Sequence, residues 1–305
     1  MSLPKRVLGR TGLEVTQLGY GAMEIRGERI WNGRPCSDEQ ARTILNAVLD
    51  AGINFVDTAN DYGKSEMYIG RHVARRRGEF YLATKCGCHM TFAGDHDETP
   101  HFWTRENILR NVSDSLMKME APYVDLLQLH NPTVELAEEY GLVDLLGELR
   151  EAGVVKYIGC SSTIPELGHY IDWGVFDTFQ IPYSALDRRH ENWITKAGES
   201  GAGIIIRGGV ARGEPGKTTG RSRADLWDLF KQAGLDELCG SESRTSFLLR
   251  FTLSHPHCHT TIVGTLYPEH LEENVAAAMR GPLPADVYAE AKKRLTEAGE
   301  SPQEI

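Results

Sequence analysis

Apolar and polar residues follow two regular patterns along the chain. Short apolar runs rich in β-branched residues recur eight times, and each is predicted to form a strand: residues 17–20, 53–57, 80–84, 124–129, 157–160, 178–181, 204–206 and 261–263. Between them, apolar residues recur every three or four positions, the period of a helix, as at 41–49, 108–119 and 142–149. Residues 37–40 (Ser-Asp-Glu-Gln) form a capping-box pattern ahead of the first of these stretches. The predicted order is therefore strand then helix, repeated.

This order predicts the fold. Nearly continuous apolar strands separated by helices indicate a parallel sheet covered by helices. Eight such units favour a closed (β/α)8 TIM barrel over an open doubly wound sheet. Residues 5–16 are predicted to form an N-terminal β-hairpin across the barrel floor. Long segments at 86–103 and 210–224 follow the third and seventh strands, so both should overhang the C-terminal mouth, where barrel enzymes place their active sites.

Composition narrows the class of protein. The 305 residues are 41% hydrophobic and 25% charged, which is typical of a globular enzyme, and no linker interrupts them, so we expect a single domain over 1–305. The 33 basic and 43 acidic residues give a formal charge of −10, which disfavours nucleic acid and anionic membranes as partners. No apolar run approaches the ~20 residues of a membrane span, and the N-terminus lacks a signal core, so a cytoplasmic location is expected. The oligomeric state is left open.

Three polar residues end otherwise apolar strands. Asp57, Lys85 and His130 each follow a buried run, so in a barrel all three should face one mouth, with Tyr62 on the loop that follows Asp57. A phenol has a pKa of ~10 and a lysine ~10.4, so neither exchanges protons well at neutral pH unless the ammonium stabilises the phenolate and a carboxylate holds the ammonium. Taken singly, each residue also fits a structural role. Together they indicate acid-base chemistry.

Five segments carry a family resemblance. They are similar in order and spacing to the aldo-keto reductases, and the resemblance spans about residues 5 to 280; the segments are 55–63, 82–85, 125–130, 158–161 and 180–184. That family has a (β/α)8 barrel and uses NADPH or NADH to reduce aldehydes and ketones to alcohols. The resemblance implies that Tyr62 is the general acid and that Lys85 lowers its pKa. It also implies that Asp57 pairs with Lys85 and that His130 orients the carbonyl.

The same resemblance implies a nicotinamide site. Ser161 and Gln180 look like the groups that hold the carboxamide, and Tyr183 looks like the ring that stacks on the nicotinamide. Ser162 stands where the family often has Asn, so one carboxamide contact would be altered or mediated by water. The pyrophosphate loop, in which backbone amides bind, corresponds to Gly208, Gly209, Arg212 and Gly213.

Residues 262–274 resemble the adenosine site, with Glu273 and Asn274 suited to adenine. Members that prefer NADPH usually carry a basic residue at the position of Gly264, Leu266 or His270, and only His270 fits this description. Thr265 could add a hydroxyl, and Arg212 a positive charge, to the binding site for the 2′-phosphate of NADP. NADP is therefore slightly favoured as the cofactor, and NAD stays open.

Other functions also fit parts of the sequence. The chain could be a cofactor-binding regulatory protein, like ion-channel β subunits that resemble this family, or an aldolase that forms a Schiff base on Lys85. Residues 211–218 nearly form a Walker A loop but do not continue as an apolar helix. The segments 86–89 and 255–259 hold zinc-type ligands without a second cluster at finger-like spacing, so no metal is predicted. The substrate is expected to be a small carbonyl compound, and sugars, small aldehydes and hydroxyketones all fit.

Overall fold

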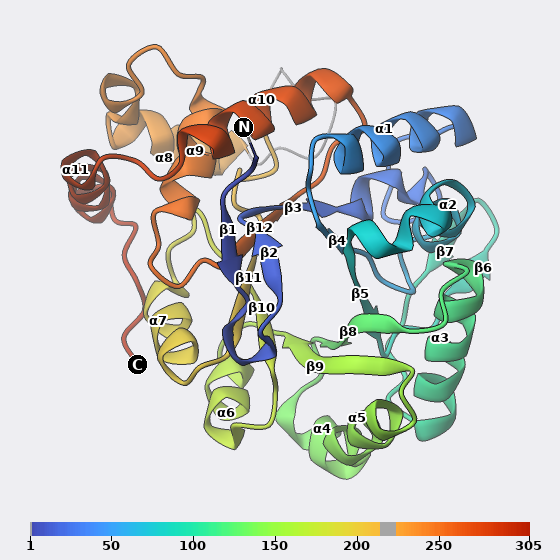
Figure 1. Ribbon diagram of the computed structural model, residues 1–305. Coiled ribbons are helices and arrows are strands. Elements are labelled where there is room, and N and C mark those ends of the chain that lie inside the picture. The colour runs from blue at the N-terminus through green and yellow to red at the C-terminus, as the bar shows by residue number, and fades with distance from the viewer. Residues whose placement is uncertain (1, 214–223) are drawn as a thin grey trace.

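A closed barrel of eight parallel strands forms the centre of the molecule (Figure 1). The computed structural model describes residues 2–213 and 224–305. Around the barrel the strands run in the order β3 (Leu18–Gly21), β4 (Phe55–Asp57), β5 (Tyr81–Cys86), β8 (Val124–His130), β9 (Val155–Ser161), β10 (Thr178–Pro182), β11 (Gly203–Arg207) and β12 (Thr260–Val263). Each strand overlaps one of the predicted runs, so the barrel prediction is confirmed.

Helices surround the strands (Figure 1). They are α1 (Asp38–Asp50), α2 (Ser65–Val73), α3 (Arg105–Lys118), α4 (Val134–Glu139), α5 (Leu142–Glu151), α6 (Glu166–Trp173), α7 (Glu191–Glu199), α8 (Ala224–Gln232), α9 (Arg244–Leu253), α10 (Pro268–Arg280) and α11 (Ala285–Glu297). The three predicted helical stretches fall within or at the ends of α1, α3 and α5. The Ser37 hydroxyl accepts a hydrogen bond from the Gln40 amide, which confirms the predicted N-cap of α1.

The predicted hairpin lies across the barrel floor, in front of the strands in Figure 1. Strands β1 (Lys5–Val7) and β2 (Glu14–Thr16) pair antiparallel. Leu8, between these strands, and Val15, on β2, are fully buried. They pack against a cluster of inward-facing barrel residues, namely Phe55, Ala83, Leu126 and Ile205. The Arg6 guanidinium fixes the hairpin further by donating to the carbonyl of Pro256 at 2.6 Å. The hairpin therefore closes the end of the barrel opposite the strands' carboxyl ends.

The loop after β5 contains its own small hairpin. Strands β6 (Thr91–Ala93) and β7 (His96–Glu98) pair antiparallel, and the Arg29 side chain donates to the Asp97 carboxylate at 2.7 Å. This pair ties the hairpin to the segment that follows β3. Residues 214–223, which make up most of the second predicted mouth loop and part of the Walker-like segment, lie outside the described residues.

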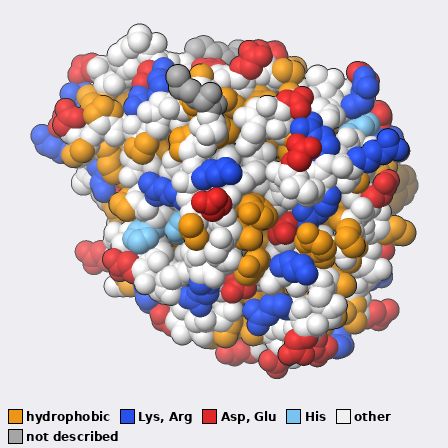
Figure 2. Space-filling model, viewed as in Figure 1, with side chains coloured by type: hydrophobic (Ala, Val, Ile, Leu, Met, Phe, Trp, Pro, Cys, Tyr) orange, Lys and Arg blue, Asp and Glu red, His pale blue; other side chains and the backbone are white. Residues whose placement is uncertain are grey.

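The charged side chains are mixed on the visible surface, and the cysteines lie in the interior. On the face shown in Figure 2, basic and acidic side chains are interspersed rather than gathered by sign. All six cysteines are buried and free of disulfides. Within residues 2–213 and 224–305, no helix combines the length and the apolar character that crossing a membrane requires.

Candidate active site

A buried ion pair lies at the carboxyl ends of β4 and β5. The Lys85 ammonium donates to Asp57 Oδ2 at 2.6 Å and to the carbonyl of Thr58 at 2.8 Å, and both charged side chains are almost fully shielded from solvent. Parallel strands bring these ends together, as the sequence predicted. A charge pair buried this deeply is stable only when its remaining hydrogen-bonding capacity is also satisfied.

Two glutamines donate the remaining hydrogen bonds to Asp57. The Oδ1 atom accepts hydrogen bonds from Nε2 of Gln128 at 3.0 Å and from Nε2 of Gln180 at 2.8 Å. Gln180 was predicted to hold the carboxamide, whereas Gln128 was not singled out. A polar residue in the middle of the apolar run 124–129 was the available signal for it.

Tyr62 lies beside this pair. It is 8% exposed, and the Lys85 Nζ atom lies 5.0 Å from the centre of its ring. The rings of Trp31 and His130 approach it edge-on, with centroids 5.9 Å and 6.1 Å away. The four residues Asp57, Tyr62, Lys85 and His130, predicted to meet at one mouth, are therefore brought together there.

Burial and charge act on the two proton-carrying groups in opposite directions. Burial raises the pKa of Tyr62; the positive charge of Lys85 works to lower it, and the net pKa lies above the ordinary value. Burial also works to lower the pKa of Lys85, but the attraction of Asp57 and Tyr62 outweighs it, so that this pKa is raised. Lys85 thus works to lower the pKa of Tyr62, as expected, but burial determines the net shift of that pKa. The phenol is protonated at neutral pH.

Three residues that the site prediction did not include surround His130. Its Nδ1 atom lies 3.3 Å from Sγ of Cys88 and 3.5 Å from Oδ1 of Asp61, and its ring meets His101 edge-on with centroids 6.0 Å apart. Asp61 is 1% exposed, and its Oδ1 atom lacks a hydrogen-bond partner among the described residues. Cys88 and His101 both come from the predicted mouth loop.

Arg207, at the end of β11, is another residue that the site prediction did not include. Its side chain has a buried Nε atom without a hydrogen-bond partner in the described part of the chain. Burial lowers the pKa of Arg207, while its charge works to lower the pKa of Tyr62. Arg207 follows the apolar run Ile204–Ile206, the same strand-end pattern that identified Lys85.

The predicted carboxamide residues lie on neighbouring strands. Ser161 ends β9, is 1% exposed, and stands in register with Gln180 of β10. Ser162 follows it, and its amide donates to the Gln180 carbonyl at 3.1 Å. The structure therefore places Ser161, Ser162 and Gln180 next to one another beside Asp57, and their role toward a cofactor stays a prediction.

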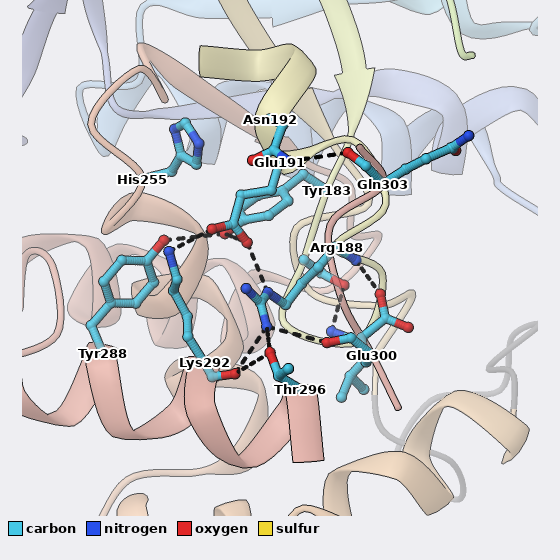
Figure 3. Close-up of polar contacts among 12 residues, drawn as sticks. Tyr183, Arg188, Glu191, Asn192, His255, Tyr288, Lys292, Thr296, Glu300 and Gln303 are labelled. Carbon is cyan, nitrogen blue, oxygen red and sulfur yellow. Dashed lines mark hydrogen bonds and ion pairs between the residues drawn. The ribbon is translucent and has the colours of Figure 1, made fainter. Parts of the chain in front are cut away.

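Tyr183 lies in a different environment, shown in Figure 3. It is 1% exposed; its hydroxyl lies 3.4 Å from Oε2 of Glu191 and 3.2 Å from the hydroxyl of Tyr288. The ring contacts His255 edge-on at 5.4 Å between centroids. Arg188 and Lys292 neutralise Glu191 in the same cluster, at 2.7 Å and 2.5 Å. These contacts join the ring to α7 and α11, and its predicted stacking role is not tested by them.

The predicted pyrophosphate loop has unusual backbone geometry. Positive φ angles occur at Gly208 (76°) and Gly213 (81°), and also at Ala211 and Arg212. A Cβ atom at Gly209 would lie 2.6 Å from the Thr261 hydroxyl, so only glycine lets the backbone pass this close to β12. A sharp glycine turn with an exposed Arg212 at a barrel mouth fits an anionic phosphate ligand.

The predicted adenosine residues lie at the start of α10 and just before it. Thr265 accepts a hydrogen bond from the Tyr267 amide at 3.1 Å, and the His270 ring meets that of Tyr267 edge-on at 5.3 Å. Glu273 accepts from the Ser243 hydroxyl, and Asn274 is 7% exposed. His270 and Asn274 are four residues apart and share one helix face.

Comparison with known proteins agrees with this arrangement. The sequence profile of the Aldo/keto reductase family matches residues 17–295. The chain is 28% identical over 291 residues to the uncharacterized oxidoreductase YqkF of Bacillus subtilis (strain 168), covering 90% of each chain. It is 27% identical over 314 residues to the NADH-specific methylglyoxal reductase of Escherichia coli (strain K12), covering 90% of this chain and 93% of that one. The solved structure of the aldo-keto reductase AKR11C1 from Bacillus halodurans, in its holo form, is similar with a TM-score of 0.82 and 29% identity over 96% of both chains. The chain belongs to the aldo/keto reductase family of oxidoreductases.

Proposed function

We propose that this protein reduces the carbonyl group of a small aldehyde or ketone to an alcohol, with NADPH or NADH as the hydride donor and Tyr62 as the general acid. The observation that carries this proposal is the buried, protonated phenol of Tyr62 beside the Lys85–Asp57 ion pair. A phenol held next to an ammonium can release a proton because the resulting phenolate is stabilised at once.

The chain's own residues would act on the proton and on the carbonyl oxygen. When bound, reduced nicotinamide supplies the hydride to the carbonyl carbon. Tyr62 gives its proton to the carbonyl oxygen, so that the C=O double bond becomes a C–O single bond and new C–H and O–H bonds are formed. His130 directs Nδ1 toward Cys88 and Asp61, which leaves Nε2 to donate to the same oxygen. Solvent then reprotonates Tyr62.

Three groups of residues would hold the cofactor. Ser161, Ser162, Gln180 and Tyr183 are proposed for the nicotinamide end, the loop from Gly208 to Gly213 for the pyrophosphate, and Thr265, His270, Glu273 and Asn274 for the adenosine. The 2′-phosphate of NADP would meet His270 and Arg212 rather than a fixed pair of guanidinium groups. We therefore favour NADPH only slightly, and the printed name of the E. coli relative concerns NADH.

The environment of Lys85 argues against the aldolase alternative. A Schiff base needs an uncharged amine that can reach a substrate. Lys85 is instead 1% exposed, with a raised pKa and two short hydrogen bonds. We therefore propose that it acts as a fixed positive charge.

The test is a comparison of the wild type with Tyr62→Phe. Binding of NADPH and of NADH is measured by fluorescence titration, and turnover is measured on a panel of aldehydes, ketones and sugars. Tyr62→Phe should bind cofactor like the wild type and lose turnover by about 10² to 10⁴-fold, the usual contribution of a general acid. Tyr140→Phe, at a 38% exposed position, is the control and should behave like the wild type. Cofactor binding without turnover on any carbonyl would favour the regulatory alternative, and failure to bind either nucleotide would overturn the proposal.

A further inference from the structure

Cys88, His101 and His130 bring their metal-binding atoms together at the mouth of the barrel. One ligand atom from each lies within 4.8 Å of the others. The three residues come from different segments: Cys88 and His101 from the two ends of the loop after β5, and His130 from the end of β8. For this reason their spacing in the sequence does not resemble that of a zinc motif.

A buried carboxylate lies at the edge of this group. Asp61 is 1% exposed, and its Oδ1 atom lies 3.5 Å from His130 Nδ1 as an ion-pair partner. A carboxylate beside a metal-binding imidazole is the usual arrangement behind a metal site. Asp61 therefore adds negative charge beside the three ligands and is not itself counted among them.

The contact between two of the ligands has the length expected of a zinc centre. With Zn–S of about 2.3 Å and Zn–N of about 2.0 Å, tetrahedral angles place sulfur and nitrogen about 3.5 Å apart. Cys88 Sγ lies 3.3 Å from His130 Nδ1. The ring of His101 stacks on Trp103 and meets His130 edge-on, and its ligand atom needs to approach by up to about 1 Å from the 4.8 Å limit.

The backbone already holds two of these residues in place. Cys88 and His101 form an antiparallel bridge, flanked by hydrogen bonds from the His89 amide to the Pro100 carbonyl at 2.7 Å and from the Phe102 amide to the Gly87 carbonyl at 2.8 Å. The small β6–β7 hairpin extends beyond this bridge. A metal bound by Cys88, His101 and His130 would therefore tie the hairpin to the barrel.

We propose that Cys88, His101 and His130 bind one Zn²⁺ ion, with a water molecule as the fourth ligand, and that the ion fixes the loop from residue 86 to 103 over the mouth. On binding, the Cys88 thiol loses its proton to solvent, and the resulting thiolate and the neighbouring Asp61 carboxylate balance the 2+ charge of the ion. A thiolate and two imidazoles suit zinc better than magnesium or calcium, which prefer oxygen. The site does not rest on the proposed reductase function, because its test measures binding and not turnover.

The experiment titrates the full chain, without a polyhistidine tag, with Co²⁺ followed by Zn²⁺. We expect one Co²⁺ per chain, an absorption band from thiolate-to-cobalt charge transfer, and loss of that band when Zn²⁺ displaces the cobalt. Zinc should also slow hydrogen exchange in residues 86–103. Cys88→Ser should abolish the band, and His101→Asn should weaken binding at least tenfold, since even residues behind the ligands contribute 10 to 100-fold.

Two controls make the result decisive. His96→Asn changes an exposed histidine of the same hairpin that lies outside the cluster, and it should bind like the wild type. His101 is exposed, so His101→Asn should retain the fold, which circular dichroism checks. Absence of the charge-transfer band, or Zn²⁺ affinity that His101→Asn and Cys88→Ser leave unchanged, would overturn the proposal.

Discussion

Asp57 is the residue on which the buried charges of the site depend. Its two oxygens accept from Lys85, Gln128 and Gln180, three donors on three different strands. Water hardly competes for these oxygens, because Asp57 is 1% exposed. Asp57 therefore holds Lys85, together with the Thr58 carbonyl, where its positive charge works to lower the pKa of Tyr62.

Replacing this carboxylate by an amide should be costly. Asp57→Asn leaves the Lys85 ammonium buried without a counter-charge, a change that typically destabilises a protein by about 3–5 kcal/mol. The double variant Asp57→Asn/Lys85→Met should recover part of this loss, because the unpaired cation is removed as well. Urea unfolding measures both, with Glu39→Gln as the control because the Glu39–Arg42 pair is exposed and worth about 0–1 kcal/mol. Additive effects of the two substitutions would contradict the interpretation.

At the residue scale, the sequence predicts the position of a polar side chain best where it ends an apolar run. Asp57, Lys85 and His130 lie together as expected, because the end of a parallel strand fixes where the side chain lies, and their roles stay predictions. Gln128 and Asp61 could not be assigned, because whether such a residue faces the site or the surrounding helices depends on strand register and loop conformation. Cys88 and His101 meet only through the pairing of a loop with itself.

At the scale of elements, the conformation and packing of the β1–β2 hairpin depend on two glycines. Gly9 has a φ of 48°, and a Cβ atom there would lie 2.3 Å from the backbone nitrogen of Gly203 on β11. Gly12, in the same hairpin, has a φ of 70° but nothing within 4 Å of its Cβ position. A substitution at Gly12 therefore tests backbone strain alone, whereas a substitution at Gly9 tests backbone strain and close packing together.

Alanine at these two positions should have unequal effects. Gly12→Ala places a side chain in the left-handed region at a cost of about 1–2 kcal/mol. Gly9→Ala adds a collision with the backbone at the barrel floor and should destabilise the protein by more than 3 kcal/mol, in the range of severe single substitutions. Thermal and urea unfolding of the two variants, measured side by side, test the difference. Equal losses would show that the hairpin moves away from β11 without cost.

Elements also show where sequence patterns fail. The hairpin at 5–16 was predicted because glycine lies in the turn between two apolar runs, whereas β7 consists of His-Asp-Glu and contains no apolar residue. The pairing of β6 with β7 is stabilised by tertiary contacts such as that between Arg29 and Asp97, which no local pattern contains. Short strands of this kind are set by the surrounding structure more than by propensity.

At the scale of the whole molecule, the repeated strand and helix pattern was sufficient to predict closure. Eight parallel units leave one shared mouth, so residues distant in sequence, such as Asp57 and Gln180, meet there as a consequence of the topology. The same closure also shields polar side chains that the site does not use. Three of these are histidines whose titration links the stability of the entire barrel to pH.

His190, His255 and His259 are held in the neutral form. Burial lowers the pKa of each of them to about 4. Each ring also accepts a hydrogen bond from a backbone amide: His190 from Ile164 at 3.3 Å, His255 from His257 at 3.2 Å and His259 from Ile204 at 2.9 Å. Protonation of the accepting nitrogen would remove that bond, so the folded state resists it.

The unfolding free energy should therefore fall as the pH is lowered. In the unfolded chain these histidines have a pKa of about 6.5, so the unfolded state takes up protons between about pH 6.5 and pH 4 while the folded state does not. The stability is fully present above pH 6.5 and is lost progressively toward pH 4, by at most about 1.4 kcal/mol per pH unit for each histidine. Urea unfolding at half-unit steps from pH 7.5 to pH 5, a range above the titration of most carboxylates, measures this slope.

His190→Gln keeps an acceptor for the Ile164 amide without a titrating ring. It should reduce the slope by about a quarter to a third, since His101 also has a lowered pKa and adds to the slope. His96→Gln, at an exposed position, should not reduce it. A slope that His190→Gln leaves unchanged would show that His190 is protonated in the folded barrel and that other groups link its stability to acid.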